Sequence, residues 1–397
     1  MVYCRRLFSL VWVSLVAPAA FSQQATSIFY SRNQKDILEI LVKALDIKVK
    51  ERVPGQKRIS FSVIPVAKGS TGGKQILVSS VSAAFVMGHE DSTNVSSIYF
   101  TPYTDLSDTY GFYTKANLWT PGNRWNLPSD FRIMNLTEYS YGLGSTTQPT
   151  DEFTLRYNYI RLYLNANRHV SRYLYLGMGL NYDRYWNVSV KDAPTNPSAF
   201  EKYGYGTTTN SNSTGITFNL LRDSRRNSIN PDRGFYTLVT FRTNPSWMHN
   251  NELWSSVYVD ARKYLLLDRT HRKILALWGF YWGTFGSVPY NNLPGTRLEY
   301  AFSSGRGYAQ GRFRGREMIY FESEYRFDIT HNGLLGGVVF ANAQSLTEED
   351  NQYHKVNPAI GFGARLKFNK ESNTNITFDF GFGEKSFTFY LGLGELF

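Results

Sequence analysis

Few side chains in this sequence have a type and spacing suited to catalysis or metal binding. The six histidines all fall in expected turns or loops, and no two have metal-ligand spacing: His89, His169, His249, His271, His331 and His354. No serine stands beside a histidine and an acid along the chain, and Walker-type phosphate motifs are absent. We therefore predict no enzyme activity, no metal and no cofactor. The alternative is a barrel phospholipase whose triad forms only in space.

The most concentrated polar chemistry lies in residues 305–315, "GRGYAQGRFRG", which hold four glycines, three arginines and two aromatic residues. Glycine permits backbone conformations that other residues avoid, and arginine can bind a carboxylate through two parallel hydrogen bonds. Alone, this segment could be an RNA-binding stretch, a phosphate-binding loop or a solvated linker. The choice between these three interpretations depends on the compartment of the protein and on the strands that flank the segment.

The first residues predict export. Arg5 and Arg6 precede an apolar stretch and then small residues, so residues 1–22 are expected to be a secretory signal peptide. An N-terminal membrane anchor is the alternative, although the apolar stretch is short for a membrane span. The only cysteine, Cys4, would leave with the signal peptide, so the mature protein would have no disulfide and no thiolate nucleophile.

The net charge and the predicted export together indicate which molecules the protein meets. Cleavage removes two arginines and no acid, so the formal net charge falls from +11 to +9. An exported basic protein meets outer membrane lipids and lipopolysaccharide before it meets nucleic acid. We therefore expect these lipids as partners and no nucleic acid.

Composition favours a membrane β-barrel. The chain has 28 tyrosines, 28 phenylalanines and 8 tryptophans, yet its mean hydropathy is negative and no apolar run after the signal peptide is long enough for a membrane helix. Aromatic, glycine-rich, exported chains that are hydrophilic on average are typical of transmembrane β-barrels. A secreted β-sandwich or propeller shares these features and is the alternative.

Period-two alternation supports the barrel, because one face of each barrel strand meets lipid and the other meets a polar lumen. The last segment places on one face Phe387, Phe389, Leu391, Leu393 and finally Phe397, a series that is broken by Glu395. The segment at 316–329 alternates in the same way, and its opposite face carries Glu322, Glu324, Arg326 and Asp328. A chain of such strands without covering helices most simply closes on itself.

We expect a 16-stranded antiparallel transmembrane β-barrel over residues 57–397. The predicted strands are 57–66, 74–87, 94–103, 108–119, 129–141, 152–167, 171–187, 213–223, 233–243, 252–266, 273–286, 316–329, 333–343, 357–369, 374–382 and 386–397. Short turns should face the periplasm and long loops the outside. On this count the long connections 188–212 and 287–315 are extracellular, whereas the long, charged turn at 222–234 is a periplasmic exception.

Residues 23–56 differ from the rest and are expected to be a periplasmic segment with one amphipathic helix. Ile37, Leu38, Leu41, Ala44 and Leu45 recur at helical spacing. The helix could lie at the barrel mouth or inside the lumen; a frayed leader is the alternative. The segment leaves no room for a globular periplasmic domain of ordinary size.

Three motifs resemble those of one family. "GRGYAQGRFRG" followed by "REMIYFESEYRF" resembles the sixth extracellular loop and next strand of the BamA/TamA family, also called bacterial surface antigens. "RDSRRNSINPDRGFY" resembles a periplasmic turn of that family, carried here by Asp223, Arg225, Asn227, Pro231, Arg233 and Gly234. The terminal Phe397 matches the signal by which the insertion machinery recognises barrels.

The resemblance implies that the loop folds back into the lumen. Its tip matches at Arg306, Gly307 and Tyr308, with Gly311 and Arg312 following. Glu324 matches the family's acid on the next strand, and Glu322 shares its face. Arginines that are merely solvated in a wet lumen are the alternative.

Two departures from the family pattern bear on the expected contacts and function. Asn342 stands where the family has an acid, so it can accept a hydrogen bond but cannot neutralise Arg306; Glu324 should carry that interaction. Gln344 stands where the family has a glycine. The family's assembly members carry periplasmic substrate-handling POTRA domains before the barrel, and we expect this chain to be a member lacking them.

We therefore expect an accessory or structural role in outer membrane protein assembly, with a seam between the first and last strands that Gly392 and Gly394 weaken. Those glycines could instead leave room for lumen side chains or allow a bend. A passive pore or translocation channel for small solutes is the second hypothesis, and a structural subunit is the third. Expected partners are the insertion machinery and, beyond it, other outer membrane proteins or a homodimer.

Overall fold

The computed structural model describes residues 34–44, 60–70, 76–89, 92–104, 109–191, 200, 203–207, 210–225, 227–248, 250, 252–269, 272–298, 304–370 and 372–397. The chain divides into two compact units, Met1–Gln34 and Lys35–Phe397, and the strands belong to the second. The predicted signal peptide, 1–22, lies outside the described residues, and so does the predicted boundary at 56.

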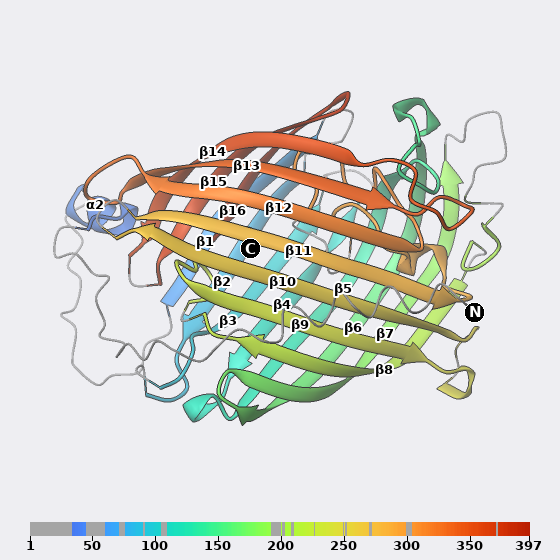
Figure 1. Cartoon of the computed structure of the whole chain (residues 1–397), viewed down its shortest axis with the longest axis horizontal. Coiled ribbons are helices and arrows are strands. Elements are labelled where there is room, and N and C mark those ends of the chain that lie inside the picture. The colour runs from blue at the N-terminus through green and yellow to red at the C-terminus, as the bar shows by residue number, and fades with distance from the viewer. Residues whose placement is uncertain are drawn as a thin grey trace. The chain divides into compact units, whose positions relative to one another are not determined.

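The described residues form sixteen antiparallel strands that close into one barrel in chain order, with β1 beside β16 (Figure 1). Their bounds are β1 Ser60–Ser70, β2 Ile76–Phe85, β3 Ser96–Thr104, β4 Tyr110–Trp119, β5 Trp125–Ser140, β6 Phe153–Ser171, β7 Leu174–Lys191, β8 Asn210–Asp223, β9 Gly234–Asn244, β10 Trp254–Asp268, β11 Lys273–Gly286, β12 Glu317–Asp328, β13 Leu335–Leu346, β14 Asn357–Asn369, β15 Thr374–Gly383 and β16 Ser386–Leu393. This confirms the predicted fold class. A helix, α2, spans Ile37–Ala44 within the predicted N-terminal segment.

Strand bounds follow the sequence prediction closely, with two informative differences. β5 begins at Trp125 rather than 129, and it contains Pro128. Proline has no N–H to donate, and the β5–β6 register accordingly passes from Asn126 to Ser129 without pairing the residues between them. β16 ends at Leu393 rather than at the last residue, for a reason given below.

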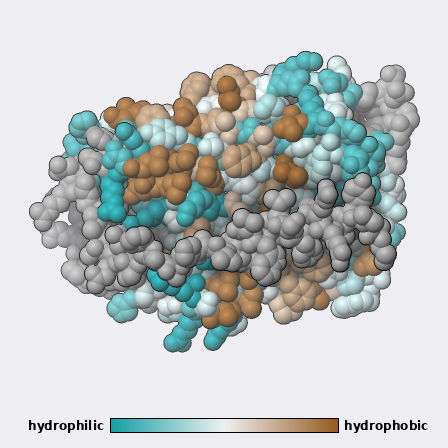
Figure 2. Space-filling view, in the orientation of Figure 1, coloured by the Kyte–Doolittle hydropathy of each residue, from teal (hydrophilic) through white to brown (hydrophobic). Residues whose placement is uncertain are grey.

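Burial alternates along the strands as a barrel wall requires. On β12, Ile319 and Phe321 are exposed, whereas Glu322 and Glu324 are fully buried on the lumen side. The apolar residues that alternation assigned to lipid thus point outward here. Figure 2 shows apolar side chains over the middle of the strands and hydrophilic ones gathered at the right-hand end of the view.

The lumen is less polar than the alternation predicts, because one wall carries aromatic side chains. Trp278, Phe280 and Trp282 of β11 and Tyr320 of β12 are buried in one cluster. The rings of Phe280 and Tyr320 stack with their centroids 5.0 Å apart. In the part of the chain that the structure describes, no helix is long and apolar enough to cross a membrane.

The two ends of the barrel differ. At one end, here called the long-loop end, β7 is followed by residues 192–209 and β11 by residues 287–316. At the other, the short-turn end, β10–β11, β12–β13 and β14–β15 connect tightly, and the β8–β9 turn lies there as predicted, because Leu174 at the start of β7 pairs with Arg222. Helix α2 lies at the short-turn end (Figure 1), where the Lys35 N–H donates to the Asn332 carbonyl at 3.1 Å.

Candidate functional site

The connection between β11 and β12, residues 287–316, folds into the barrel and is called the lumen loop below; its residues 287–298 and 304–316 are described. Glycines set its path. Gly305, Gly307 and Gly311 have φ of 65°, 107° and 73°, a region where other residues are strained. A methyl group at Gly311 would lie 2.5 Å from the Tyr139 carbonyl oxygen, so the backbone reaches the wall closely there.

Arg306 at the tip of the loop is surrounded by carboxylates and is only 1% exposed. Its guanidinium forms ion pairs with Glu322 and Glu324 of β12, and Nη1 donates to Asp379 Oδ2 of β15 at 3.0 Å. Its Cζ also lies 3.5 Å from the ring centroid of Phe340. A buried guanidinium is stable only when paired in this way, so the cage fixes the tip of the loop.

The backbone of the tip is bound to the wall as well. The Gly307 N–H donates to Thr388 Oγ1 of β16 at 2.9 Å, and Tyr308 Oη donates to the Pro358 carbonyl at 2.7 Å. Asn342 was expected to accept a hydrogen bond, but its amide donates to the Arg306 carbonyl at 2.9 Å. The Asn342 side chain therefore holds the loop backbone, whereas Asp379 provides the acid that β13 lacks.

Two glycines of β15 make room for the tip. A methyl group at Gly381 would lie 2.5 Å from the Gly307 nitrogen, and one at Gly383 would lie 2.6 Å from the Tyr308 ring. Gln344 contacts the loop from β13, where its Oε1 accepts from Thr296 Oγ1 at 2.9 Å. The wall is shaped to receive the loop.

Two further arginines of the loop, Arg312 and Arg314, contact the opposite wall. Arg314 is buried; its guanidinium donates to Glu138 Oε1 of β5 at 3.0 Å and to the Tyr290 carbonyl at 2.8 Å. Arg312 Nη1 donates to Thr147 Oγ1, after β5, at 2.9 Å. The lumen loop thus spans from β12–β16 on one side to β5 on the other.

The β8–β9 turn, residues 224–233, crosses the short-turn end. Asp223 and Arg225 form a buried ion pair of 2.9 Å at its start. The Asn227 amide donates to the Ser372 carbonyl in the β14–β15 turn at 3.0 Å, and its Oδ1 accepts from the Ile229 N–H at 2.7 Å.

The other motif residues shape the same turn. Gly234 has a φ of 110°, where glycine is favoured. Pro231 is buried and Arg233 is half-buried. The turn motif therefore holds the turn across the mouth against the β14–β15 turn.

The C-terminal residues contradict one expectation. Phe397 does not continue the lipid-facing series; it is 3% exposed inside the lumen, with its ring 5.2 Å from that of Trp278. The chain turns inward because Gly394 adopts a φ of 82° and the Glu395 N–H donates to the Ile229 carbonyl at 3.0 Å. The role of Phe397 as an insertion signal stays a prediction.

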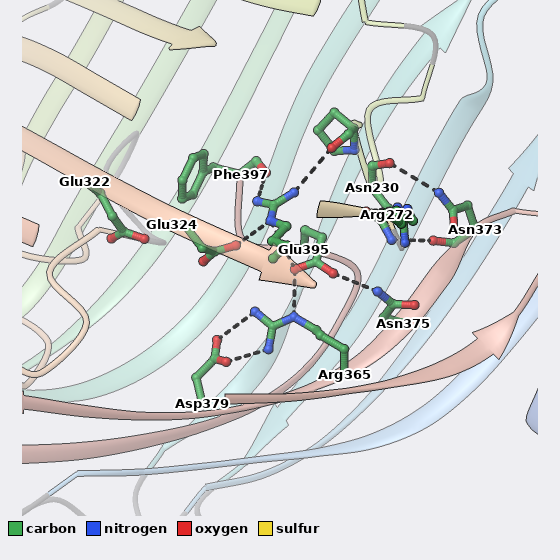
Figure 3. Close-up of polar contacts among 12 residues, drawn as sticks. Asn230, Arg272, Glu322, Glu324, Arg365, Asn373, Asn375, Asp379, Glu395 and Phe397 are labelled. Atoms are coloured by element: carbon green, nitrogen blue, oxygen red, sulfur yellow. Dashed lines mark hydrogen bonds and ion pairs between the residues drawn. The ribbon is translucent and has the colours of Figure 1, made fainter. Parts of the chain in front are cut away.

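Ion pairs join this C-terminal tail to the Arg306 cage (Figure 3). Arg365 donates to Glu395 Oε2 at 2.8 Å and to Asp379 Oδ1 at 2.5 Å. Arg326 donates to Glu324 Oε1 at 2.5 Å and to the Phe397 carbonyl oxygen at 2.9 Å. Acids and arginines alternate from the loop tip to the end of the chain, so the cage and the tail form one network.

The seam between β1 and β16 is short. Within the described residues its register comprises Lys68–Tyr390, Gly69–Phe389 and Ser70–Thr388, whereas the β1–β2 register runs from Ser60–Ala84 to Lys68–Ile76. Continuing the seam would place Pro65, which has no N–H, opposite Leu393. Gly392 lies in this stretch that has no β1 partner, and Gly394 lies beyond the strand.

Several site residues were missed from the sequence, although two carried a signal. Asp379 stands on the predicted lumen face of its strand, and comparing the lumen acids of all neighbouring strands would have found it. Glu395 breaks an apolar series, which indicates that the chain leaves the lipid face there. Among the described residues, no group of His, Cys, Asp and Glu could hold a metal ion.

A family model described as the Omp85 superfamily domain matches residues 80–397. BamA from Haemophilus ducreyi lacking POTRA domains 1-3 superposes with a TM-score of 0.53 at 13% identity over 85% of this chain and 70% of its own. CdiB from Acinetobacter baumannii superposes with a TM-score of 0.53 at 11% identity over 85% of this chain and 60% of its own.

CdiB from Escherichia coli superposes with a TM-score of 0.54 at 10% identity over 87% of this chain and 64% of its own. The chain thus spans less than two thirds of either CdiB. No curated protein sequence matches the chain significantly. The match over most of the sequence shows that this chain belongs to the Omp85 superfamily and is a β-barrel protein of the bacterial outer membrane.

Proposed function

We propose that the protein acts without enzymatic chemistry as an accessory or structural component of outer membrane protein assembly, with its short-turn end in the periplasm. The observation that carries this proposal is the incomplete seam between β1 and β16 in a barrel whose lumen holds a docked loop. A barrel wall whose strands were all fully paired would offer no free backbone groups to a partner strand. In this wall the pairing of β1 with β16 is incomplete.

The seam offers backbone groups to a partner strand. Leu391–Leu393 and Pro65–Ala67 are described but do not pair with each other. Unpaired strand edges are templates for strand addition, since main-chain hydrogen bonds supply affinity with little demand on sequence. Both strands keep their other neighbours, because β1 pairs with β2 and β16 with β15.

The docked lumen loop favours this role over the alternative of a passive pore. Arg306 and Arg314 tie the loop to facing walls, and Tyr290 of the loop packs against Phe200 from the β7–β8 connection at 4.9 Å. A channel for solutes would have to pass these segments. Because both arginines are buried and paired, moving the loop would break these ion pairs and leave Glu322 buried without a cation.

Partners of the proposed role are outer membrane lipids, lipopolysaccharide, the insertion machinery that assembles this barrel, and other outer membrane proteins or a second copy of the chain. A structural subunit would share the same surfaces. A pull-down of the protein in mild detergent, followed by determination of the mass of the complex, distinguishes a heteromeric assembly from a homodimer.

Covalent closure of the seam tests the proposal. Gly69→Cys with Phe389→Cys joins a seam pair, and the matched control Val63→Cys with Val81→Cys joins a continuous β1–β2 pair. We expect oxidation of the seam pair to lower the amounts of other folded outer membrane barrels in cells, with recovery after reduction, whereas the control changes nothing. Complete crosslinking of the seam with unchanged barrel amounts would refute a role of the seam in assembly.

A further inference from the structure

A group of cations and aromatic rings lies on the outer surface of the barrel wall at the short-turn end. Its cations are Arg172, Arg222 and Lys263, which are all exposed, and its rings are those of Tyr173 and Phe235. These five residues are called the outer basic cluster below. They come from the β6–β7 turn and from β8, β9 and β10, and strands β7–β10 are neighbours in the wall (Figure 1).

The two rings hold the three cations on one patch. Arg222 Cζ lies 4.5 Å and Lys263 Nζ 5.9 Å from the centroid of the Phe235 ring. The Tyr173 ring meets the Phe235 ring edge-on with centroids 6.3 Å apart, and Arg172 Cζ lies 5.1 Å from the Tyr173 centroid. A ring attracts a cation to its negative face but does not neutralise it, and a guanidinium over a ring keeps N–H groups for an acceptor.

The outer basic cluster borders the apolar outer surface of the wall. In the β7–β8 register, Leu176 pairs with Leu220, and the next outward-facing pair toward the short-turn end contains Arg222. On β10, Lys263 stands between outward-facing apolar residues, of which Leu265 is exposed. A charged side chain that faces hydrocarbon costs free energy, and this cost falls toward the headgroup level of the membrane. The cluster therefore lies where acyl chains meet headgroups.

The acids of strands β7–β10 do not neutralise the cluster, because each of them pairs with another cation. The ion pairs are Asp183–Arg242, Asp223–Arg225, Asp260–Arg262 and Asp268–Lys273. The β8–β9 turn adds Asp232, with Arg233 beside it in the chain. Among the residues that the structure describes, no acid forms an ion pair with Arg172, Arg222 or Lys263. The cluster thus keeps its positive charge.

We infer that the outer basic cluster binds the headgroup of an anionic phospholipid, whose phosphate accepts hydrogen bonds from Arg222 and Lys263 while its acyl chains lie along Leu176 and Leu220. Arginine and lysine are the side chains that proteins use to bind phosphate. Basic residues at a membrane surface attract anionic lipids, and aromatic rings favour the same level of the bilayer. A soluble anion would match the cations but would leave the leucines beside them uncovered.

This inference goes beyond the proposed function, because the surface lies on β7–β10 and not at the seam between β1 and β16. With the short-turn end in the periplasm, the lipid belongs to the inner leaflet of the outer membrane. Only this choice of leaflet rests on the orientation proposed above. Binding of the lipid to the purified protein does not depend on it.

Lipid binding to the full-length protein in maltoside detergent tests the inference. Native mass spectrometry counts the lipids on the folded protein as phosphatidylglycerol is titrated, and zwitterionic phosphatidylcholine is the comparison lipid. The variants are Arg222→Gln, Lys263→Gln and the conservative Lys263→Arg. Arg316→Gln is the matched control, because it removes an arginine that lies over the Tyr203 ring at the long-loop end. Heat-modifiable migration on gels checks that each variant is folded.

We expect the wild type, Lys263→Arg and Arg316→Gln to bind phosphatidylglycerol with similar affinity, and more tightly than phosphatidylcholine. Arg222→Gln and Lys263→Gln should each bind phosphatidylglycerol about fivefold more weakly, the effect of one basic residue at an anionic membrane surface. Added salt should weaken the binding of phosphatidylglycerol to the wild type, a readout that needs no variant.

Three results would overturn the assignment. They are phosphatidylcholine binding the wild type as tightly as phosphatidylglycerol, binding of phosphatidylglycerol that does not respond to salt, and folded Arg222→Gln and Lys263→Gln that bind it as the wild type does. Because no other outer membrane protein takes part in the measurement, its failure would leave the proposed role in assembly untouched.

Discussion

Arg306 and Asp379 stand 73 residues apart in the chain, yet the Arg306 guanidinium donates to the Asp379 carboxylate at 3.0 Å inside the barrel. One residue belongs to the lumen loop and the other to β15. This ion pair ties the loop to β15, the strand that pairs with seam strand β16, so the docking of the loop and the position of β16 are physically connected.

Arg306→Ala should undock the loop. It leaves Glu322, Glu324 and Asp379 buried without their shared cation, and breaking a buried ion pair costs about 3–5 kcal/mol. We expect a smaller folded, heat-modifiable fraction in the outer membrane. Arg316→Ala, which removes an arginine whose side chain contacts the Gly286 carbonyl at an exposed position, is the control. Equal folded fractions for the two variants would show that the cage does not hold the loop.

Gly381→Ala tests the fit between β15 and the loop tip without changing any charge. The added methyl group would lie 2.5 Å from the Gly307 nitrogen, and overpacking of this kind costs about 1–3 kcal/mol. Gly279→Ala is the matched control, because its methyl group would meet nothing closer than 3.5 Å. Denaturant unfolding in detergent should show a lower free energy of unfolding for Gly381→Ala only. Equal stability of both variants would contradict the close approach of β15 to the loop tip.

How far the sequence predicted these features depends on the range of the interactions. Strand bounds were predictable because alternation is a local pattern. The acids of β12 that bind the loop were predictable because β12 directly follows the loop in the sequence. Asp379 was not identified as a partner, since its strand lies three strands beyond β12 and only the closed barrel brings the two together. The inward turn at Gly394 was missed because the apolar series resumes at Phe397 and hides it.

Glu395→Gln should loosen the C-terminal tail. It removes the carboxylate that Arg365 binds at 2.8 Å and leaves the buried Arg365 with fewer charged partners. We expect carboxypeptidase to release Phe397 faster, as followed by mass spectrometry of the folded protein. Glu384→Gln, at an exposed turn where the side chain pairs with Lys355, is the control. If Phe397 is released equally fast from both variants, Glu395 does not hold the tail.

The attachment of α2 should depend on pH. Two side-chain hydrogen bonds lower the pKa of Glu39 below its usual value. The one from Lys370 has the larger effect and the one from Lys43 the smaller. Because this pKa is lowered, the ionised Glu39 stabilises the attachment fully at any pH above the ordinary pKa of glutamate. The stabilisation is lost as the pH falls through the lowered pKa. Because Glu39 is largely hydrated, the effect is small.

Hydrogen exchange over Ile37–Ala44, corrected for intrinsic rates, measures this attachment. Protection should be constant from about pH 7 to 5 and fall in more acidic solution, below the ordinary pKa of about 4.3. Glu39→Gln should show the low protection at every pH. Protection that is insensitive to both pH and the substitution would show that other contacts hold the helix.

Single-channel conductance of the purified protein in planar bilayers tests the central claim, that the docked loop fills the lumen. We predict a small or briefly flickering conductance for the wild type and a larger, longer-lived one for folded Arg306→Ala. A large, steady conductance of the wild type that Arg306→Ala leaves unchanged would contradict the account and favour a passive pore.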